Sequence, residues 1–383
     1  MLRFRLPQQW ALCLALLAAL VTLAACTTAP RPVTPPPPPE PIAVSALPGF
    51  AADPLDGLAG AIAQQCARSQ PPAGWRETCA SMPQGAPGPD RAALAGWLER
   101  RFVARELVDA ENPAGLVTGY YEPLLTGSLT RDRPGQVPLR GRPPDLLTID
   151  LTAVEPRLAG MRLRGRLEGT KVVPYYSRAE LGREDARAAA DAPVLAWADD
   201  PVDAFFLEIQ GSGRLQLRDG STMRVGYADQ NGHPYRAIGK TLIDRGALSR
   251  EQVTAPAIRR WLQENPAAAP GVMNTNPSLV FFRQLPPPAD PTLGPPGSLG
   301  VPLTPLRSIA VDRGRIPLGS LVYLQTTHPV SGQPLERLMV AQDTGGAIRG
   351  TKRADLFWGF GVDAALAAGT MKAPARMWVL EPR

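Results

Sequence analysis

The sequence predicts a mainly β protein with flanking helices, divided into two domains. Short segments that alternate apolar and polar residues, as half-buried strands do, are the main pattern after residue 100. Three segments with helical periodicity lie before and between these strands. About 335 residues follow the N-terminal leader and linker, which is more than one hydrophobic core normally organises. No segment recurs along the chain, so a repeat architecture is not expected.

The N-terminus has the features of a secretory signal peptide with a lipidation site. Arg3 and Arg5 precede an apolar run from Trp10 to Ala25, which is about 16 residues long, whereas a bilayer span needs roughly 20. The run ends in LAAC, a lipobox-like sequence in which Cys26 is the candidate lipidated residue. We predict a signal peptide over 1–25 and acyl chains on Cys26 that hold the protein on a membrane. An uncleaved anchor is the alternative.

A proline-rich linker follows the lipidation site. Thr27, and not Asp, stands after Cys26, which resembles lipoproteins sorted to the outer membrane of Gram-negative bacteria. Residues 26–44 include PRPVTPPPPPEP, which cannot pack a core and predicts an extended polyproline segment. At about 3.1 Å per residue, roughly 20 residues could span about 60 Å. We therefore expect the folded part to stand away from the outer membrane, in the periplasm.

The cysteines fit an exported protein. Cys13 lies in the signal peptide and Cys26 is the lipidation site, so Cys66 and Cys79 remain. In an oxidising periplasm these two residues predict a disulfide, worth about 3 kcal/mol on the loop-entropy model; a free pair is the alternative. The chain has two histidines and neither CxxC nor HExxH spacing, so no metal site and no cofactor are expected.

The charge of the chain is mildly positive. Lys and Arg number 41 and Asp and Glu 35, a net charge of +6, which becomes +4 when Arg3 and Arg5 leave with the signal peptide. The basic residues are scattered, with no Lys/Arg run and no aromatic stacking motif, so nucleic acid is not an expected partner. A weak attraction to an acidic polymer is all that this charge favours.

The first folded helix is predicted within DRAALAGWLERRFVARELV. Asp90 is a good N-cap, because its carboxylate can accept a hydrogen bond from a free amide of the first turn. Leu94, Trp97, Leu98 and Phe102 then share one face at helical spacing, which predicts that this face packs on the core.

Strands dominate the rest of the chain. FFLEIQ, GRLQLRDGSTMRVGYA and SLVYLQ alternate as strands do, and Asp219-Gly220 predicts a hairpin turn within the second of them. Helices are expected within RAIGKTLIDRG, ended by Gly246, and within APAIRRWLQENP, ended by Pro266. Residues 294–305, GPPGSLGVPLTP, have the composition of a loop.

Two glycine-containing motifs indicate carbohydrate binding. GYYEP places two aromatic residues and an acid between turn residues, and aromatic faces beside carboxylates suit sugar rings. IQGSGR is expected to end a strand with two glycines around a serine, which lets a ligand approach the backbone closely. A tight turn under a buried tyrosine and a β-bulge are the structural alternatives. The candidate substrate-binding residues in these motifs are Tyr120, Tyr121, Glu122, Gln210, Ser212, Gly213 and Arg214.

The motifs, taken together and in this order, resemble the membrane-bound lytic murein transglycosylase A family. The resemblance runs from about residue 90 to the C-terminus. The motifs that carry it are GYYEPLLTGS, PYYSRAEL, DAFFLEIQGSGR, VGYADQNGHPYRAIG, NPSLVFFR, GVPLTPLRSIAVDR and AQDTGGAIRGTKRADLFWGFG. It implies a double-psi β-barrel formed by 45–122 and 278–383, an inserted β-domain over 123–277, and a glycan groove between them.

The resemblance also implies an activity and its residues. The family cleaves the β-1,4 bond between N-acetylmuramic acid and N-acetylglucosamine in peptidoglycan without water, leaving a 1,6-anhydromuramyl end. Its catalytic aspartate matches Asp355, a second acidic position matches Asp343, and Gly345 and Gly346 join the substrate-binding residues. Peptidoglycan strands and the outer membrane are then the expected partners; murein synthases or scaffold proteins are further candidates that the sequence does not identify.

A single proton-carrying aspartate is chemically sufficient for this reaction. Glycosidases normally need a second carboxylate to activate water or attack the sugar, but here the C6 hydroxyl of the sugar is the nucleophile. Asp355 would protonate the leaving oxygen and then accept the hydroxyl proton. Burial beside Phe357 and Trp358, and the like charge of Asp343, are expected to raise its pKa. Asp343 either tunes Asp355 or simply binds the amides of the glycines that follow Thr344.

Three other functions are the alternatives to this one. An aspartic protease is excluded because Asp343-Thr344-Gly345 occurs once and Ala341-Gln342, not an apolar pair, precedes it. A non-catalytic protein that binds or tethers murein would release no product. An inverting glycoside hydrolase would release reducing sugar ends.

Overall fold

The computed structural model describes residues 39–72, 74–83, 90–159, 161, 163–183 and 192–383. The predicted signal peptide, the lipidation site Cys26 and most of the proline-rich linker lie outside these residues. No helix among the described residues is long and apolar enough to span a bilayer.

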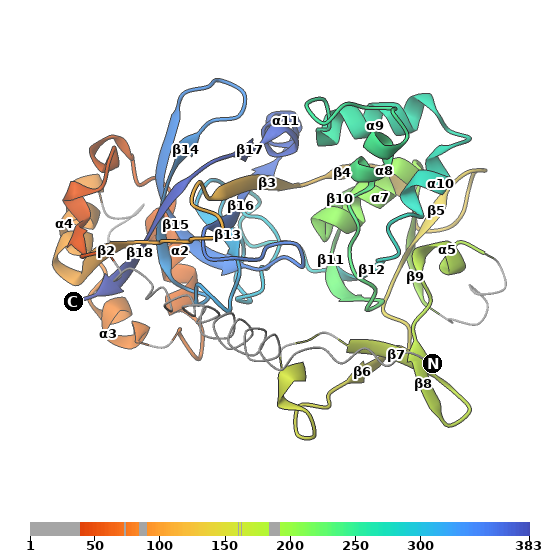
Figure 1. Cartoon of the computed structure of the whole chain (residues 1–383), viewed down its shortest axis with the longest axis horizontal. Coiled ribbons are helices and arrows are strands. Elements are labelled where there is room, and N and C mark those ends of the chain that lie inside the picture. Colours follow the sequence, from red (N-terminus) through yellow and green to blue (C-terminus); the bar gives the residue numbers. More distant parts are fainter. Residues whose placement is uncertain (1–38, 73, 84–89, 160, 162, 184–191) are drawn as a thin grey trace, which may run out of the picture. The chain divides into compact units, whose positions relative to one another are not determined.

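The largest sheet has nine strands, and both candidate acids lie on it (Figure 1). In spatial order the strands are β1 (Ile42–Ala43), β2 (Phe102–Glu106), β18 (Arg376–Pro382), β14 (Leu321–Thr327), β15 (Pro334–Asp343), β13 (Ser308–Val311), β16 (Arg353–Phe360), β3 (Leu116–Glu122) and β17 (Lys372–Ala373). Strand β13 pairs in parallel with β15 and antiparallel with β16, so it lies between the strands that carry Asp343 and Asp355.

The other two sheets come from the segment between β3 and β13. A six-stranded sheet has the order β12 (Val280–Leu285), β11 (Thr222–Gln230), β10 (Ser212–Gln216), β4 (Leu124–Ser128), β9 (Val194–Ala198) and β5 (Val137–Arg140). A three-stranded sheet consists of β6 (Leu147–Ile149), β7 (Leu163–Glu168) and β8 (Lys171–Pro174). Only Pro123 separates β3 from β4, so the chain passes directly from the first sheet into the second.

Helices flank the sheets, which confirms the predicted fold class. Near the first sheet are η1 (Val44–Ala46), η2 (Phe50–Ala52), α2 (Leu58–Cys66), α3 (Trp75–Ala80), α4 (Arg91–Arg101) and α11 (Val362–Thr370). The segment that forms the other sheets contains η3 (Pro156–Leu158), α5 (Arg178–Leu181), α7 (Pro201–Gln210), α8 (Ile238–Asp244), α9 (Ala255–Glu264) and α10 (Ala269–Met273).

Helix α4 begins as predicted but ends early. The Asp90 side chain accepts a hydrogen bond from the Ala93 amide at 2.7 Å, which confirms the cap. The helix stops at Arg101, and Phe102 begins β2, which pairs with β18. The strand pairing therefore overrides the helical spacing of Phe102. Its ring still packs on Trp97, with centroids 5.6 Å apart.

The prediction of a strand at FFLEIQ was wrong, because these residues form helix α7. Asp200 caps the helix by accepting from the Val202 amide at 2.7 Å, Pro201 occupies the first turn, and Gly211 ends it with a left-handed φ of 79°. These start and stop signals decide the conformation, and the alternation of apolar and polar residues does not. The motif IQGSGR thus joins a helix to β10 and does not end a strand.

The remaining local predictions are confirmed. Strands β10 and β11 form the hairpin around Asp219-Gly220, and SLVYLQ lies mainly in β14. Helix α8 ends before Gly246, helix α9 ends before Pro266, and 294–305 is a loop with one isolated bridge.

One sheet boundary differs from the division expected from the resemblance. Strand β12 starts after residue 278, where the barrel was expected to resume, yet it pairs with β11 in the six-stranded sheet. The chain therefore stays in the six-stranded sheet until Leu285.

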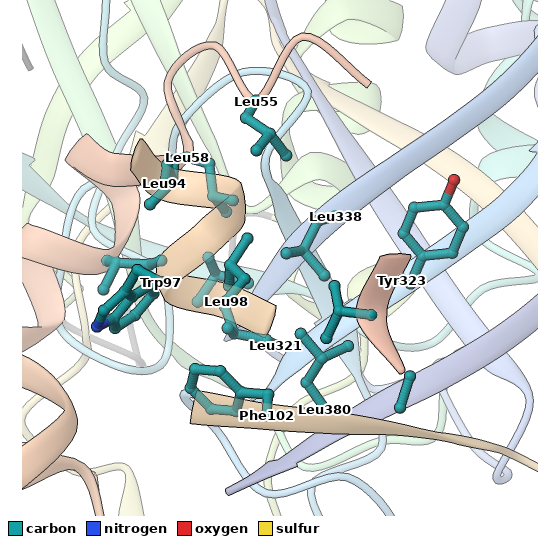
Figure 2. Close-up of a cluster of buried hydrophobic side chains, with 14 of the residues drawn as sticks. Leu55, Leu58, Leu94, Trp97, Leu98, Phe102, Leu321, Tyr323, Leu338 and Leu380 are labelled. Atoms are coloured by element: carbon teal, nitrogen blue, oxygen red, sulfur yellow. The ribbon is translucent and has the colours of Figure 1, made fainter. Parts of the chain in front are cut away.

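The N-terminal helices pack on one end of the first sheet through a single apolar cluster. Figure 2 shows Leu94, Trp97 and Leu98 of α4 beside Phe102 of β2 and the leucines of β14, β15 and β18. This face of α4 is the one predicted from the spacing. Cys66 and Cys79 pack against this apolar cluster and form a disulfide between the end of α2 and helix α3, with Cα atoms 5.5 Å apart.

A buried arginine fixes β13 beneath this cluster. Arg307, just before β13, is fully buried and binds Asp53 through two hydrogen bonds of 2.7 and 3.1 Å. It also donates to the Asp56 carbonyl and to the Leu338 carbonyl on β15. Asp53 in turn accepts from the Leu338 amide at 2.7 Å. The pair therefore ties the N-terminal segment to β15 next to the start of β13.

We predict that Arg307→Met strongly destabilises the protein, because it leaves the Asp53 carboxylate buried without its cation. The free energy of unfolding, measured by urea denaturation, should fall by about 3–5 kcal/mol. Arg337→Met is the matched control: Arg337 contacts only the exposed Asp56 among described carboxylates, so the loss should stay below about 1 kcal/mol. Equal losses in the two variants would contradict the account of Arg307.

Candidate active site

A cavity of about 470 Å³ brings together residues from the two larger sheets. Strands β3, β13, β15 and β16 of the first sheet contribute to its lining, as do β10, β11 and β12 of the second. Among the residues that line it are Tyr120, Ser212, Arg283, Ala310, Asp343 and Asp355. The two candidate acids therefore share one cavity.

A β-bulge turns Asp343 toward this cavity. On β15, Ala341 pairs with Ile309, but the next pair on β13, Ala310, faces Asp343 and skips Gln342. Without the extra residue, Asp343 would share a strand face with Ala341, which is buried in the core. The bulge places Asp343 on the face of Ala310 instead.

Ala310 also pairs with Asp355 on the opposite side of β13. Both aspartates therefore flank one small residue, on one face of the sheet, with their backbones roughly 10 Å apart across two strand spacings. The methyl group of Ala310 leaves the space between the two carboxylates open as part of the cavity.

The Asp343 carboxylate is held by four hydrogen bonds. Oδ1 accepts from the Ser298 amide at 2.9 Å, the Ser298 hydroxyl at 2.8 Å and the Thr344 amide at 2.8 Å. Oδ2 accepts from the Tyr120 hydroxyl at 3.0 Å. The alternative in which Asp343 binds the amides of Gly345 and Gly346 is therefore wrong: the donors come from the 294–305 loop, from the adjacent residue and from β3. Such a set fixes the side chain and favours its ionised form.

Asp355 has a different environment. The parallel pairing of β16 with β3 sets Thr118 beside it, and the Thr118 hydroxyl donates to Asp355 Oδ1 at 2.5 Å. Thr118 Oγ1 in turn accepts from Arg353 Nη2 at 2.8 Å. No described group donates to the second oxygen, Oδ2, within the cavity. That oxygen is the one able to carry an exchangeable proton.

The pKa of both aspartates is raised above that of a free aspartic acid. Burial, which disfavours the charged form, is the main cause of the increase for each. For Asp343, the bonds from Ser298, Thr344 and Tyr120 oppose it. For Asp355, the Thr118 bond and the Arg353 charge oppose it, while the negative charge of Asp343 adds a smaller increase. The expectation that burial and a like charge act together on Asp355 thus holds, with burial the larger cause.

Tyr120 stays neutral and donates. Burial and the charges of Asp343 and Asp355 raise the pKa of its hydroxyl well above the ordinary value. Its ring packs on Phe357 with centroids 5.2 Å apart, which fixes the hydroxyl toward Asp343. In the described part of the chain, no group of three or more His, Cys, Asp or Glu side chains is arranged to hold a metal ion.

Comparison with known proteins identifies the family. The model of the MltA specific insert domain matches residues 116–283, and that of the 3D domain matches residues 307–381. A crystal structure of MltA from Neisseria gonorrhoeae is 32% identical, with a TM-score of 0.72 over 89% of this chain and 90% of that one.

This chain belongs to the membrane-bound lytic murein transglycosylase A family.

Relatives from Escherichia coli extend the comparison. The membrane-bound lytic murein transglycosylase A of strain K12 is 36% identical over 273 residues, which cover 69% of this chain but only 65% of that protein. A crystal structure of E. coli MltA with bound chitohexaose is 31% identical, with a TM-score of 0.59 over 78% of this chain and 80% of that one. The fold expected from the resemblance is confirmed by these structural neighbours.

Most of the predicted site residues of this MltA-family chain line the cavity. These are Tyr120, Gln210, Ser212, Asp343, Gly345, Gly346 and Asp355. Four others do not line it. Tyr121 donates its amide to Gln210 Oε1 at 3.0 Å, which helps to place the end of α7. Gly213 packs closely against Leu207 and the Pro123 carbonyl, so its role is in packing.

Glu122 and Arg214, the remaining two, form a buried ion cluster. Glu122 is fully buried and accepts from Arg214 at 2.9 Å and from Arg224 at 3.1 Å. All three line a second cavity described below. Each of the two motifs, GYYEP and IQGSGR, therefore contributes residues to both cavities. Because these residues are neighbours in the sequence, the sequence alone suggested a single site.

Sequence reasoning also missed several residues of the first cavity. Arg178 and Glu208 form a largely buried ion pair at its wall, and Tyr227 and Tyr235 present partly exposed rings. None lies next to the acids in sequence. Arg178 and Glu208 come from helices α5 and α7, Tyr227 from strand β11 and Tyr235 from a loop, so only the tertiary fold brings them to the cavity. Thr118 was also missed; it does not line the cavity but donates to Asp355, and its place two residues before Tyr120 on a strand was the one local signal that could have indicated it.

We predict that Thr118→Val raises the pKa of Asp355 further, because the hydroxyl that stabilises the ionised carboxylate is removed while the shape is kept. Titration of the Asp355 carboxyl carbon by NMR measures this shift. Thr118→Ser keeps the donor and should leave the titration close to that of the wild type. A lower pKa in Thr118→Val would show that Thr118 does not stabilise the charged form.

Proposed function

We propose that this chain is a lytic transglycosylase that cleaves the β-1,4 bond between N-acetylmuramic acid and N-acetylglucosamine in peptidoglycan. The observation that carries this proposal is the difference between the two acids of one cavity. Asp343 has both oxygens occupied by hydrogen bonds, whereas Asp355 has one oxygen without a described donor. One proton-carrying acid and one fixed anion suit a reaction that needs no activated water.

A glycan chain is the ligand that the cavity suits best. Tyrosine rings and exposed backbone stand beside carboxylates and amides around the acids. The structure of E. coli MltA with bound chitohexaose shows a related protein with an oligosaccharide. We infer that the glycan lies along the cavity with its scissile oxygen at Asp355.

In this mechanism Asp355 acts twice. Its raised pKa keeps it protonated closer to neutral pH than a free aspartic acid, so it donates a proton to the leaving oxygen. The resulting carboxylate then accepts the proton of the C6 hydroxyl, which attacks C1 and closes the 1,6-anhydro ring. The hydroxyl belongs to the same sugar, so its effective concentration is high and it outcompetes water.

Asp343 supplies a negative charge near the reacting sugar. The sugar develops positive charge as the bond breaks, and a fixed anion stabilises that charge without moving. The same charge helps to raise the pKa of Asp355. An inverting hydrolase would instead need Asp343 to accept a proton from water, and its four hydrogen bonds disfavour that role.

The N-terminal sequence supports a proposal for the localisation of the protein. We propose an outer-membrane lipoprotein, anchored through Cys26, whose catalytic part faces the periplasm and acts in cell-wall turnover. The proposed domains are the barrel around the first sheet and the inserted β-domain that carries the second. A murein-binding tether without activity is the second candidate, and the proposed chemistry separates it from the first.

Purified peptidoglycan sacculi test the activity. We predict soluble anhydromuropeptides, lighter by one water than hydrolysis products, when the products are analysed by mass spectrometry. Asp355→Asn should lower the rate of product release about 10²- to 10⁴-fold or more, because the amide keeps the shape of the side chain but cannot donate and accept a proton. Reducing N-acetylmuramic acid ends would contradict transglycosylation, and the absence of soluble product would favour a tether.

Asp343→Asn is the informative partner variant in the same assay. Removal of the like charge lowers the pKa of Asp355, so partial activity should remain with an optimum at lower pH. Circular dichroism checks that both variants are folded. If Asp343→Asn were the only folded but inactive variant, the two roles would be reversed.

A further inference from the structure

A second cavity adjoins the first. It has a volume of about 490 Å³ and includes Glu122, Arg214, Arg224, Thr222 and Phe360 in its lining. Leu285, the last residue of β12, lines both cavities, so they meet at this side chain. The second cavity contains the two motif residues, Glu122 and Arg214, that the proposed mechanism does not use.

The strand register shows that both cavities lie on one face of the six-stranded sheet. Ser212, Gly226 and Arg283 stand opposite one another on β10, β11 and β12, and all three line the first cavity. The next row lies two positions further along each strand and lines the second cavity. It consists of Arg214, Arg224 and Leu285. Residues two apart on a strand share a face and lie about 7 Å apart.

This face carries more positive than negative charge. Arg214, Arg224 and Arg283 all point from it, and Glu122 is the carboxylate that pairs with the first two. Within the described residues, no carboxylate lies within ion-pair distance of Arg283, which is exposed and donates to the Tyr227 carbonyl at 3.4 Å. The ring of Phe360 covers Arg214 at 3.9 Å. Three guanidinium groups against one carboxylate leave an excess of two positive charges.

We propose that three arginines, Arg283 of the first row and Arg214 and Arg224 of the second, bind a carboxylate group carried by the muramic acid residues of the substrate. A guanidinium group matches a carboxylate through paired hydrogen bonds, whereas an uncharged glycan offers no such group. Muramic acid bears a lactyl group, which ends in a free carboxylate or continues into a stem peptide with carboxylates of its own. A three-residue peptide extends about 10 Å, enough to reach from the first row to the second.

The inference rests on the proposed function for the identity of the polymer, but binding tests it separately from catalysis. The Asp355→Asn protein is titrated calorimetrically with three soluble ligands of similar length. These are chitohexaose, which has no charge; a peptide-free murein oligosaccharide, which has lactyl carboxylates; and the same oligosaccharide with its stem peptides.

We expect at least one carboxylate-bearing ligand to bind about tenfold more tightly than chitohexaose at low salt, and this preference to weaken as salt is added. In Arg283→Gln the preference should fall several-fold while the affinity for chitohexaose stays the same. Arg250→Gln removes the same charge from an exposed turn that lines neither cavity, and should change nothing.

A second pair of variants probes the second cavity without changing a residue of the buried ion cluster. Thr222 is exposed and lines the second cavity beside Arg224. Thr222→Glu places a negative charge there and should reduce the preference, whereas the uncharged Thr222→Gln, of similar size, should keep it. This comparison separates charge from shape.

The three ligands identify the source of the carboxylate. A preference for the peptide-free oligosaccharide assigns the site to the lactyl carboxylate, and a preference that appears only with stems assigns it to the peptide; either supports the proposal. Equal affinities for all three, or a parallel loss for chitohexaose in Arg283→Gln, would overturn it. Anhydro products still formed by the Asp355→Asn protein would refute the catalytic role of Asp355 instead, and the affinity ratios would still test the arginines.

Discussion

The candidate active site depends on the bulge at Gln342, where strand β15 passes β13. The Gln342 side chain is fully buried, accepts from the Ser308 hydroxyl at 2.5 Å and donates to the Ala61 carbonyl at 2.9 Å. These bonds hold the extra residue in place, and Arg307, just before β13, ties that strand to Asp53 and to the Leu338 carbonyl of β15. If the bulge were removed, Asp343 would turn into the apolar core, where an unpaired carboxylate is strongly disfavoured.

The same register gives two chemically identical side chains different properties. Asp343 lies at the end of a strand, where a loop and the following residue supply amides and a hydroxyl. Asp355 lies in the third position of β16, whose backbone is occupied by strand pairing, so its carboxylate depends on one neighbouring hydroxyl. Separation of roles between two acids is how a single cavity can hold one group ionised and another protonated.

Much of this arrangement could be predicted from the sequence. Predictions based on a cap or turn residue were correct: the helix start at Asp90, the hairpin turn at Asp219-Gly220 and the helix end before Pro266. They failed at FFLEIQ, where alternation was weighed without Asp200 and Gly211, the residues that start and stop helix α7. The family resemblance supplied the pair Asp343 and Asp355, but composition and spacing alone did not.

The rest depends on long-range pairing that no local pattern reveals. Ser298, a loop residue 45 positions before Asp343, supplies two of its four hydrogen bonds, and Thr118 lies 237 positions before Asp355. Glu122 and Arg214 stand close in sequence to residues of the first cavity, yet the register assigns them to the second. Only the pairing of β10, β11 and β12 shows that the two cavities share one face.

The central claim is that Asp355 carries the proton while Asp343 is ionised. Neutron diffraction from a crystal of the perdeuterated protein at neutral pH tests it directly, because deuterons on carboxyl oxygens are visible. The account predicts a deuteron on Asp355 Oδ2, none on Asp343, and a Thr118 hydroxyl that points to Asp355 Oδ1. A deuteron on Asp343 together with a bare Asp355 would contradict it.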